Sequence, residues 1–419
     1  MRQKIKKNNR WRGGKFFVVG IFTAAGFFSV AYFGLPSMFP IYVEKDSKLV
    51  LTPEFIGIQS GALGNIDNNN SDPKEEKENK FIAIHIKTPN PLKAIYMTSW
   101  VAGTPSFRDK LIKIADETEI NSIIIDIKDY TGKIAFEVND PLLQKIGAAE
   151  NRIPNIRQFI KNLHDKDIYV IGRISVFQDP YFALKYHEFA VKRESDGKIW
   201  KDYKGIVWLD VASKDVWDYM IALAKEAYSV GFDELNFDYV RFPSDGDMND
   251  IYYPYSEEKI LNDPYYGKAE ALRDFFKYLH SGLKDSGAVL SVDLFGMVTT
   301  NPDDLNVGQM LEYAEPYFDY ISPMVYPSHY PSGFNGWPNP NKEAYGVVLY
   351  SLERAAERML AASSSPRKIR PWLQDFDYGG NYGIAEVRAQ IQAVYDSGLT
   401  SWMLWDPSNI YTREALLNK

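Results

Sequence analysis

The sequence predicts a (β/α)8 barrel, in which eight parallel strands alternate with helices. After Pro91, short runs rich in β-branched and aromatic residues alternate with longer runs that have helical periodicity. The alternation gives eight strands and seven intervening helices over roughly 310 residues, which fits such a barrel in count and size. An open doubly wound sheet is the less favoured alternative, because no glycine-rich phosphate-binding motif follows the first strand.

The expected elements follow one another at short intervals. The expected strands are Lys93–Thr98, Ser122–Lys128, Ile168–Ile174, Glu234–Asp238, Val289–Asp293, Tyr320–Val325, Ile369–Gln374 and Trp402–Trp405. The expected helices are Ser106–Thr118, Ile153–Lys166, Lys214–Val230, Lys268–Asp285, Leu305–Ala314, Glu343–Ala362 and Ala385–Ser397. Because side chains alternate along a strand, one face of each strand should meet the helices and the other should point into the barrel.

The segment before the barrel begins with a basic, then apolar, stretch. The first fifteen residues carry seven positive charges and no acid, and Phe16 to Leu35 contains no charged residue. That run is long enough to cross a bilayer as a helix, and its basic flank predicts a cytoplasmic N-terminus with the remainder outside. The alternative is a signal peptide cleaved near Ala31, which would leave a secreted protein.

These observations divide the chain into three parts. Residues 1–35 are expected to be a transmembrane signal anchor or a signal peptide, so the lipid bilayer is an expected partner. Residues 36–92 are expected to be a juxtamembrane segment and flexible linker, since residues 61–80 are rich in Asn, Gly and charge. Residues 93–419 are expected to form the barrel, located outside the cytoplasm.

Composition argues against several classes of function. Setting aside the seven N-terminal charges leaves 41 of the 48 Lys and Arg residues against 55 Asp and Glu residues, a net charge of about −14 that disfavours nucleic acid as a partner. The absence of Cys excludes disulfides and thiolate metal sites. The five His residues are scattered, so neither a metal nor another cofactor is expected. No Gly-x-Ser-x-Gly motif is present.

The end of the fourth expected strand locates the candidate active site. Leu235 and Phe237 alternate with Asn236 and Asp238, so Asp238 should face the mouth formed by the C-terminal strand ends, where barrel enzymes carry their catalytic groups. The alternative is a solvated loop carboxylate paired with Arg241. A second acid across the mouth would suit glycosidic hydrolysis, which needs one ionised and one protonated carboxyl group.

Different surroundings should separate the roles of these acids. Arg173 and Arg241 would keep Asp238 ionised as the nucleophile or base. Asp293 is followed by a largely apolar run that would raise its pKa and suit it to the acid role, although it could instead be a structural hydrogen-bond acceptor. Asp375 is the rival for the acid role, and Asp210 is a weaker candidate.

The remaining candidates would bind substrate. They are Asp126, Lys128, Arg173, Asp210, Tyr239, Arg241, Tyr326, His329, Trp372, Gln374 and Trp405. Aromatic rings at strand ends can stack on sugar rings. Asp126 and Lys128 should reach the mouth together and form a salt bridge or bind hydroxyl groups. A Schiff base on Lys128 is less favoured, because Asp126 and Asp129 would keep its amine charged.

Seven motifs in order resemble a known family. They are Lys93–Thr98, Ile125–Asp129, Gly172–Pro180, Phe237–Pro243, Ser291–Gly296, Pro323–Tyr330 and Pro371–Phe376. From about Lys93 to Asp406, some three quarters of the chain, the sequence resembles a glycoside hydrolase-like family of bacterial (β/α)8 proteins first catalogued as a domain of unknown function. The resemblance implies a barrel of the glycosidase type and supplies no substrate. Val292 departs from the Ala expected before the strand-five Asp.

The sequence therefore predicts a glycoside hydrolase that acts on a cell-envelope or extracellular polysaccharide. The alternative is a catalytically inactive carbohydrate-binding module at the cell surface, because a fold alone does not define an activity. A third, weaker interpretation is a phosphate-handling barrel, for which Gly379, Gly380 and Gly383 after the seventh strand are the support.

Overall fold

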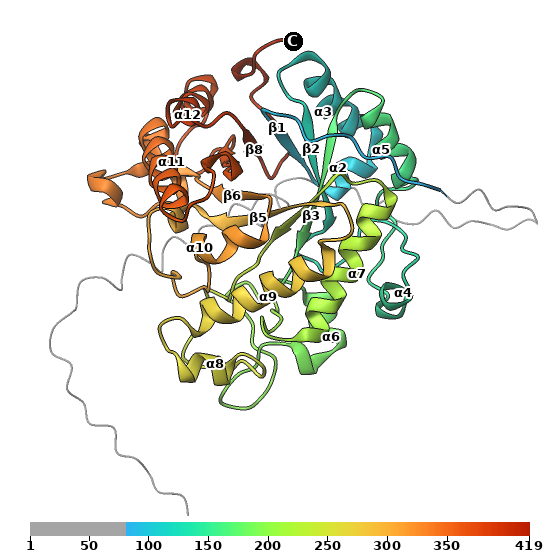
Figure 1. Ribbon diagram of the computed structural model, residues 1–419, viewed down its shortest axis with the longest axis vertical. Helices are drawn as coiled ribbons and strands as arrows, with labels where there is room; N and C mark the ends of the chain where they lie inside the picture. Colours follow the sequence, from blue (N-terminus) through green and yellow to red (C-terminus); the bar gives the residue numbers. More distant parts are fainter. Residues whose placement is uncertain (1–80) are drawn as a thin grey trace, which may run out of the picture.

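The chain folds into a closed barrel of eight parallel strands, as the sequence predicted (Figure 1). The computed structural model describes residues 81–419. The strands are β1 (Lys93–Met97), β2 (Ser122–Lys128), β3 (Tyr169–Ser175), β4 (Glu234–Asp238), β5 (Val289–Phe295), β6 (Tyr320–Met324), β7 (Trp372–Gln374) and β8 (Trp402–Trp405). Each strand pairs with the next along the chain, and β8 pairs with β1 to close the barrel.

Helices connect the strands and surround the barrel in Figure 1. They are α2 (Ser99–Gly103), α3 (Pro105–Glu117), α4 (Pro141–Ile146), α5 (Ile156–His164), α6 (Pro180–Lys185), α7 (Lys214–Val230), α8 (Glu257–Asn262), α9 (Gly267–Leu283), α10 (Leu311–Ala314), α11 (Ala344–Ala361) and α12 (Ile384–Asp396). The predicted bounds of β2, β4, α7 and β8 are confirmed, and most other predicted elements differ by a few residues at their ends.

One predicted helix, 305–314, is largely wrong. Only its last turn, α10, is helical, because Leu305, Asn306 and Gly308 all have positive φ angles, of 52°, 58° and 84°. Residues in the left-handed region cannot continue a right-handed helix. The backbone N–H of Asn306 donates instead to the side chain of Asp304, so this segment forms a turn at the mouth.

Two apolar clusters show which way each strand faces. The larger cluster lies between the sheet and the helices and contains Ile123 and Ile125 of β2. The smaller cluster fills the barrel interior and contains Ile124 of β2 and Ile171 of β3. The predicted alternation of β2 is therefore confirmed up to Asp126, and it sets which polar side chains reach the mouth.

A bulge in β2 ends this alternation. Asp126 pairs with Arg173, but the next residue of β3, Ile174, pairs with Lys128. Ile127 therefore has no partner residue on β3. Ile174 belongs to the outer cluster, and residues opposite one another in a ladder share a face. Lys128 consequently turns away from the barrel interior.

Both ends of the described chain pack against the barrel. Residues 81–92 form neither helix nor strand, yet the Ile86 N–H donates to Asp233 at 2.8 Å and Leu92 is buried in the interior cluster. The C-terminal residues lie beside α3, where Glu119 N–H donates to the Leu417 carbonyl at 2.8 Å. Within residues 81–419, no helix is both long and apolar enough to span a bilayer. The predicted anchor or signal peptide, residues 1–35, and residues 36–80 of the predicted linker lie outside the described residues.

Candidate active site

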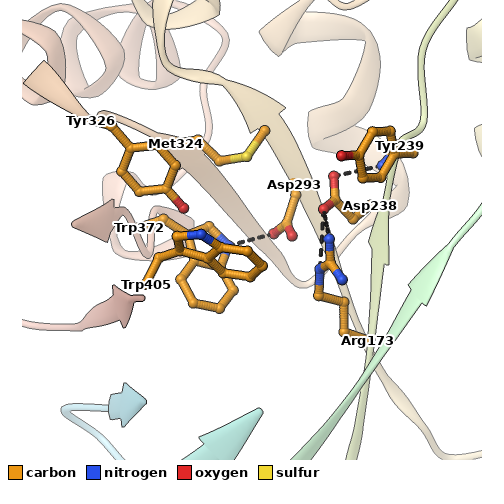
Figure 2. A pocket seen from close by; sticks show the side chains of 8 residues that line it. All are labelled: Arg173, Asp238, Tyr239, Asp293, Met324, Tyr326, Trp372 and Trp405. Carbon is orange, nitrogen blue, oxygen red and sulfur yellow. Dashed lines mark hydrogen bonds and ion pairs between the residues drawn. The ribbon is translucent and has the colours of Figure 1, made fainter. Parts of the chain in front are cut away.

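A pocket opens at the C-terminal ends of the strands, among the predicted site residues. The space between its lining atoms measures about 230 Å³, a value that includes open solvent. Its lining, drawn in Figure 2, consists of Arg173, Asp238, Tyr239, Asp293, Met324, Tyr326, Trp372 and Trp405. The structure thus brings two of the three predicted catalytic acids together with five of the predicted substrate-binding residues.

Asp238, the last residue of β4, is held by an arginine and a backbone amide. One carboxylate oxygen accepts hydrogen bonds from Nε of Arg173, at 3.1 Å, and from Nη2 of the same guanidinium. The other oxygen accepts from the backbone N–H of Tyr239 at 2.5 Å. Tyr239 has a φ of 52°, a conformation that is costly for a non-glycine residue. Asp238 is therefore held in place by one guanidinium and one backbone amide.

Arg173 is in turn held by a second carboxylate. Its Nη1 donates to Asp126 at 2.7 Å, and the hydroxyl of Tyr96 donates to the other oxygen of Asp126 at 2.5 Å. Burial raises the pKa of Asp126 to about 6, against the opposing effect of Arg173. Asp126 therefore positions the guanidinium that contacts Asp238, and it is not among the residues that line the pocket.

Asp293, on β5, has neutral hydrogen-bond donors where Asp238 has a cation. Its Oδ1 accepts from Nδ2 of Asn236 at 2.9 Å and from the indole N–H of Trp372 at 2.8 Å. Burial, together with the negative charge of Asp238, raises the pKa of Asp293 well above its usual range. These surroundings favour the protonated form of the Asp293 carboxyl group.

The two acids occupy neighbouring positions in the sheet. β4 and β5 pair in register from Glu234 and Val289 to Phe237 and Val292. Continuing this register by one residue places Asp238 beside Asp293, and adjacent strands lie about 4.8 Å apart. Side chains at such positions leave the sheet on the same face, so both carboxyl groups enter the pocket from adjoining strands (Figure 2).

Aromatic rings form the opposite side of the pocket. Figure 2 shows Tyr326, Trp372 and Trp405 on one side of Asp293, with Asp238 and Arg173 on the other. The Trp405 ring stacks on Tyr96 with ring centres 4.0 Å apart, and it lies nearly perpendicular to Trp372, at 88° and 5.5 Å. Rings fixed in this way present rigid apolar faces on which a sugar can pack.

Lys128 does not reach the mouth, so its predicted contact with Asp126 is wrong. Its amine donates to Asp179 at 2.6 Å, and it lies 5.5 Å from the ring centre of Tyr219 on α7. The side chains of Lys128 and Asp179 are both fully buried. The bulge in β2 is the cause, because it directs Lys128 toward the helix layer.

Asp375 and Asp210 lie outside the pocket lining and bind backbone and hydroxyl groups. Asp375 accepts from the backbone N–H of Thr412 at 2.9 Å and from its hydroxyl at 2.6 Å, and burial raises the pKa of Asp375 to about 6. Asp210 accepts from the hydroxyl of Ser256 and from backbone amides, among them that of Tyr255 at 2.8 Å. Both acids therefore tie loops together in this structure.

Gln374 is the last residue of β7, and His329 lies in the connection that follows β6. Oε1 of Gln374 accepts from the Ser328 hydroxyl at 2.8 Å, and its amide donates to the Phe376 carbonyl at 2.9 Å. His329 lies within hydrogen-bond distance of Ser328, at 2.8 Å, and beside the ring of Tyr326. Burial lowers the pKa of His329 to about 3, so its imidazole is neutral. Neither side chain lines the pocket.

Arg241 does not pair with Asp238, contrary to one of the predictions. Its guanidinium lies beside the rings of Trp208, at 4.6 Å, Phe295, at 4.9 Å, and Tyr239, at 5.5 Å. The loop after β4 turns at Tyr239 and carries Arg241 away from the carboxylate. Of the two predicted cationic partners, Arg173 alone contacts Asp238.

Two side chains in the network were not among the predicted site residues. Asn236 contacts Asp293, and Tyr96 contacts Asp126. Asn236 shares the inward face of β4 with Asp238, and Tyr96 occupies an inward position of β1, so strand alternation could have identified both. Among residues 81–419, no group of three His, Cys, Asp or Glu side chains could hold a metal ion.

Comparison with known proteins connects this site to a family. Residues 94–411 match the family described as "Putative glycosyl hydrolase domain". A hypothetical protein from Ruminiclostridium thermocellum is similar at 36% identity over 48% of this chain and 96% of that chain, with a TM-score of 0.41. The PgaB (BpsB) glycoside hydrolase domain from Bordetella bronchiseptica is similar at 14% identity over 78% of this chain and 99% of that chain, with a TM-score of 0.55.

The likeness to the Bordetella domain shows a shared fold alone, because the identity is low. The spore cortex-lytic enzyme SleL from Bacillus cereus is similar at 10% identity over 78% of this chain and 73% of that chain, with a TM-score of 0.44. No curated protein matches the chain. The family match extends over most of the barrel, from β1 to the segment after β8. This chain, a closed barrel of eight parallel strands, therefore belongs to the family described as "Putative glycosyl hydrolase domain".

Proposed function

We propose that this protein is a glycoside hydrolase in which Asp238 is the nucleophile or base and Asp293 is the acid. The observation that carries the proposal is the contrast between two carboxyl groups in one pocket. Asp238 is bound by the Arg173 guanidinium, whereas Asp293 is buried and bound by neutral donors. Hydrolysis of a glycosidic bond requires such a pair, with one group ionised and the other protonated.

The geometry supports a defined division of labour. Asp293 would deliver its proton to the leaving glycosidic oxygen, and its raised pKa keeps that proton available. Asp238 would attack the anomeric carbon or remove a proton from water. Carboxyl groups about 5–5.5 Å apart are typical of retaining enzymes, and about 6.5–9.5 Å is typical of inverting ones. Adjacent positions on neighbouring strands favour the shorter separation, hence retention with Asp238 as nucleophile.

Asp375 is a weaker candidate for the acid role than Asp293. Both of its oxygens are occupied by Thr412, and it does not line the pocket. A general acid must come within hydrogen-bond reach of the leaving oxygen. Asp293 lines the pocket, whereas Asp375 would require the segment around Thr412 to move before it could reach a substrate there.

The proposed substrate is a cell-envelope or extracellular polysaccharide. The basic and apolar N-terminal sequence supports this assignment, since it predicts a membrane-anchored or secreted protein with its barrel outside the cytoplasm. The aromatic wall of Tyr326, Trp372 and Trp405 supports a carbohydrate ligand. Family membership supports hydrolase chemistry and leaves the sugar and linkage open.

The test is a screen of the full-length protein against cell-wall glycans and exopolysaccharides. The comparison set is the wild type, Asp238→Asn, Asp293→Asn and, as a matched surface control, Asp285→Asn, which changes an exposed Asp in the turn after α9. We expect the first two variants to lose hydrolysis and the control to retain it. Turnover by Asp238→Asn at the wild-type rate would refute the assignment. Binding of glycans without hydrolysis by the wild type would indicate a carbohydrate-binding module instead.

A further inference from the structure

Arg241 is buried beside the pocket without an ionic partner. Arg241 is 6% exposed, and its guanidinium is surrounded by the rings of Trp208, Tyr239 and Phe295. Tyr239 lines the pocket, and Phe295 packs against the interior cluster that contains Met324, Trp372 and Trp405. Arg241 thus lies at the rim of the proposed active site, between the ends of β4 and β5.

The other buried arginines of residues 81–419 all have carboxylate partners. Arg152 pairs with Asp129 at 2.5 Å, Arg173 pairs with Asp126 at 2.7 Å, and Arg370 pairs with Glu234 at 2.8 Å. Within this range, no carboxylate oxygen lies within 4.0 Å of Arg241. A buried charge without a partner is costly, so its presence in a folded protein calls for an explanation.

Nearby acids do not take the place of a partner. Asp202 is bound by the Trp208 indole at 3.1 Å and by backbone amides, and Asp238 is bound by Arg173. Burial raises the pKa of Asp245, and its carboxylate oxygens lie more than 4.0 Å from the nitrogens of Arg241. These groups act on Arg241 only at longer range, and burial lowers the pKa of Arg241 itself.

One edge of the guanidinium remains available to a ligand. Nη1 donates to the Phe242 carbonyl at 3.0 Å and to the Ser244 hydroxyl at 3.2 Å, which fixes the orientation of the group. Nε and Nη2 of Arg241 donate to no acceptor among residues 81–419. Both nitrogens keep some solvent-accessible surface. These two nitrogens present the pair of parallel N–H groups that binds a carboxylate through both of its oxygens.

We propose that Arg241 binds a carboxylate on the substrate, so that the polysaccharide is an acidic glycan containing a uronic acid or another carboxyl-bearing sugar. This inference rests on the proposed function and adds the chemical class of the substrate to it. The aromatic rings around Arg241 would strengthen the ion pair by excluding water from it. They would also fix the position of the acidic sugar relative to Asp238.

The first experiment measures binding to the wild-type full-length protein. The probes are acidic oligosaccharides that contain glucuronate, galacturonate or N-acetylmuramate, each compared with the same oligosaccharide after carboxyl reduction. We expect at least one acidic probe to bind about ten-fold or more tightly than its reduced form, with a difference that shrinks as salt rises. Equal affinity within every pair, or no binding of any probe, would overturn the proposal. Tighter binding of sugar phosphates than of the acidic probes would replace the carboxylate with a phosphate.

The second experiment assigns the effect to Arg241. Arg241→Gln should abolish the preference for the acidic probe, and Arg241→Lys should retain part of it, because Lys keeps the charge and loses the two-nitrogen edge. Arg193→Gln is the matched control, since Arg193 is exposed and pairs with Asp250 at 3.0 Å. An unchanged preference in Arg241→Gln would refute the assignment, and Arg241→Lys serves if Gln prevents folding. Hydrolysis of neutral glycans by the wild type but not by Asp238→Asn would sustain the proposed enzyme while removing the acidic substrate.

Discussion

The hydrogen bond from Trp372 to Asp293 offers a direct test of the acid assignment. The indole nitrogen of Trp372 lies 2.8 Å from Oδ1 of Asp293. Trp372 must be the donor in this bond, because the indole nitrogen cannot accept a hydrogen bond. This bond stabilises the charged form of Asp293. Trp372→Phe removes the donor while keeping an aromatic ring in the pocket wall, so the pKa of Asp293 should rise further.

The size of this shift follows from the strength of the lost bond. A hydrogen bond to a charged group contributes about 1.5–3 kcal/mol, and one pKa unit corresponds to about 1.4 kcal/mol. Trp372→Phe should therefore raise the pKa of Asp293 by about one to two units. Asn236→Ala removes the other donor to Asp293, at 2.9 Å, and should shift the pKa in the same direction.

The assay is the pH dependence of kcat/KM, measured with an aryl glycoside of the sugar identified in the glycan screen. Loss of the acidic proton ends activity at alkaline pH, so the alkaline limb should move to higher pH in Trp372→Phe, whatever happens to the maximal rate. Met324→Leu is the control, because Met324 lines the same pocket and carries no N–H donor. An unmoved limb, or one that moves to lower pH because water enters the space left by the indole, would refute the reasoning.

Three further predictions concern two buried side chains and the stereochemistry of the reaction. Burial raises the pKa of Asp406 to about 7, whereas an unfolded Asp has a pKa of about 3.9. The stability that the protonated carboxyl group of Asp406 contributes is therefore full below about pH 4 and is lost as pH rises through 7. Asp406→Asn should therefore increase the free energy of unfolding at pH 8, by an amount on the order of 3–4 kcal/mol that vanishes near pH 4 in urea titrations. Lys128→Met leaves Asp179 as an unpaired buried charge and should destabilise the fold by about 3–5 kcal/mol; a midpoint of unfolding close to that of the wild type would contradict the observed ion pair. NMR of the first product released should show retention of the anomeric configuration, and an inverted product would assign Asp238 to the role of base.

Several features of the site could be predicted because they depend on local pattern. The two-residue period of a strand places Asp238 and Asn236 on one face, and the order of strands along the chain makes β4 and β5 neighbours. The convergence of Asp238 and Asp293 follows from these two facts. The apolar sequence around Asp293 also predicts the direction in which its pKa is shifted.

Other features depend on contacts between distant parts of the chain. Asp375 meets Thr412, which lies 37 residues later, and this contact removes its side chain from the pocket. Arg241 follows the left-handed turn at Tyr239, and the direction of the chain after such a turn cannot be read from composition.

The sequence by itself determined the barrel and the strand ends that carry its chemistry. Periodicity and the order of elements can be read along the chain without knowing the exact position of any side chain. Only the tertiary structure decided the partner of each charge. A bulge of one residue sends Lys128 to Asp179, and the packing of two connections against the end of β5 leaves Arg241 among aromatic rings. The physical reason is that the electrostatic energy of a buried charge depends on distances of a few ångströms between residues far apart in the chain.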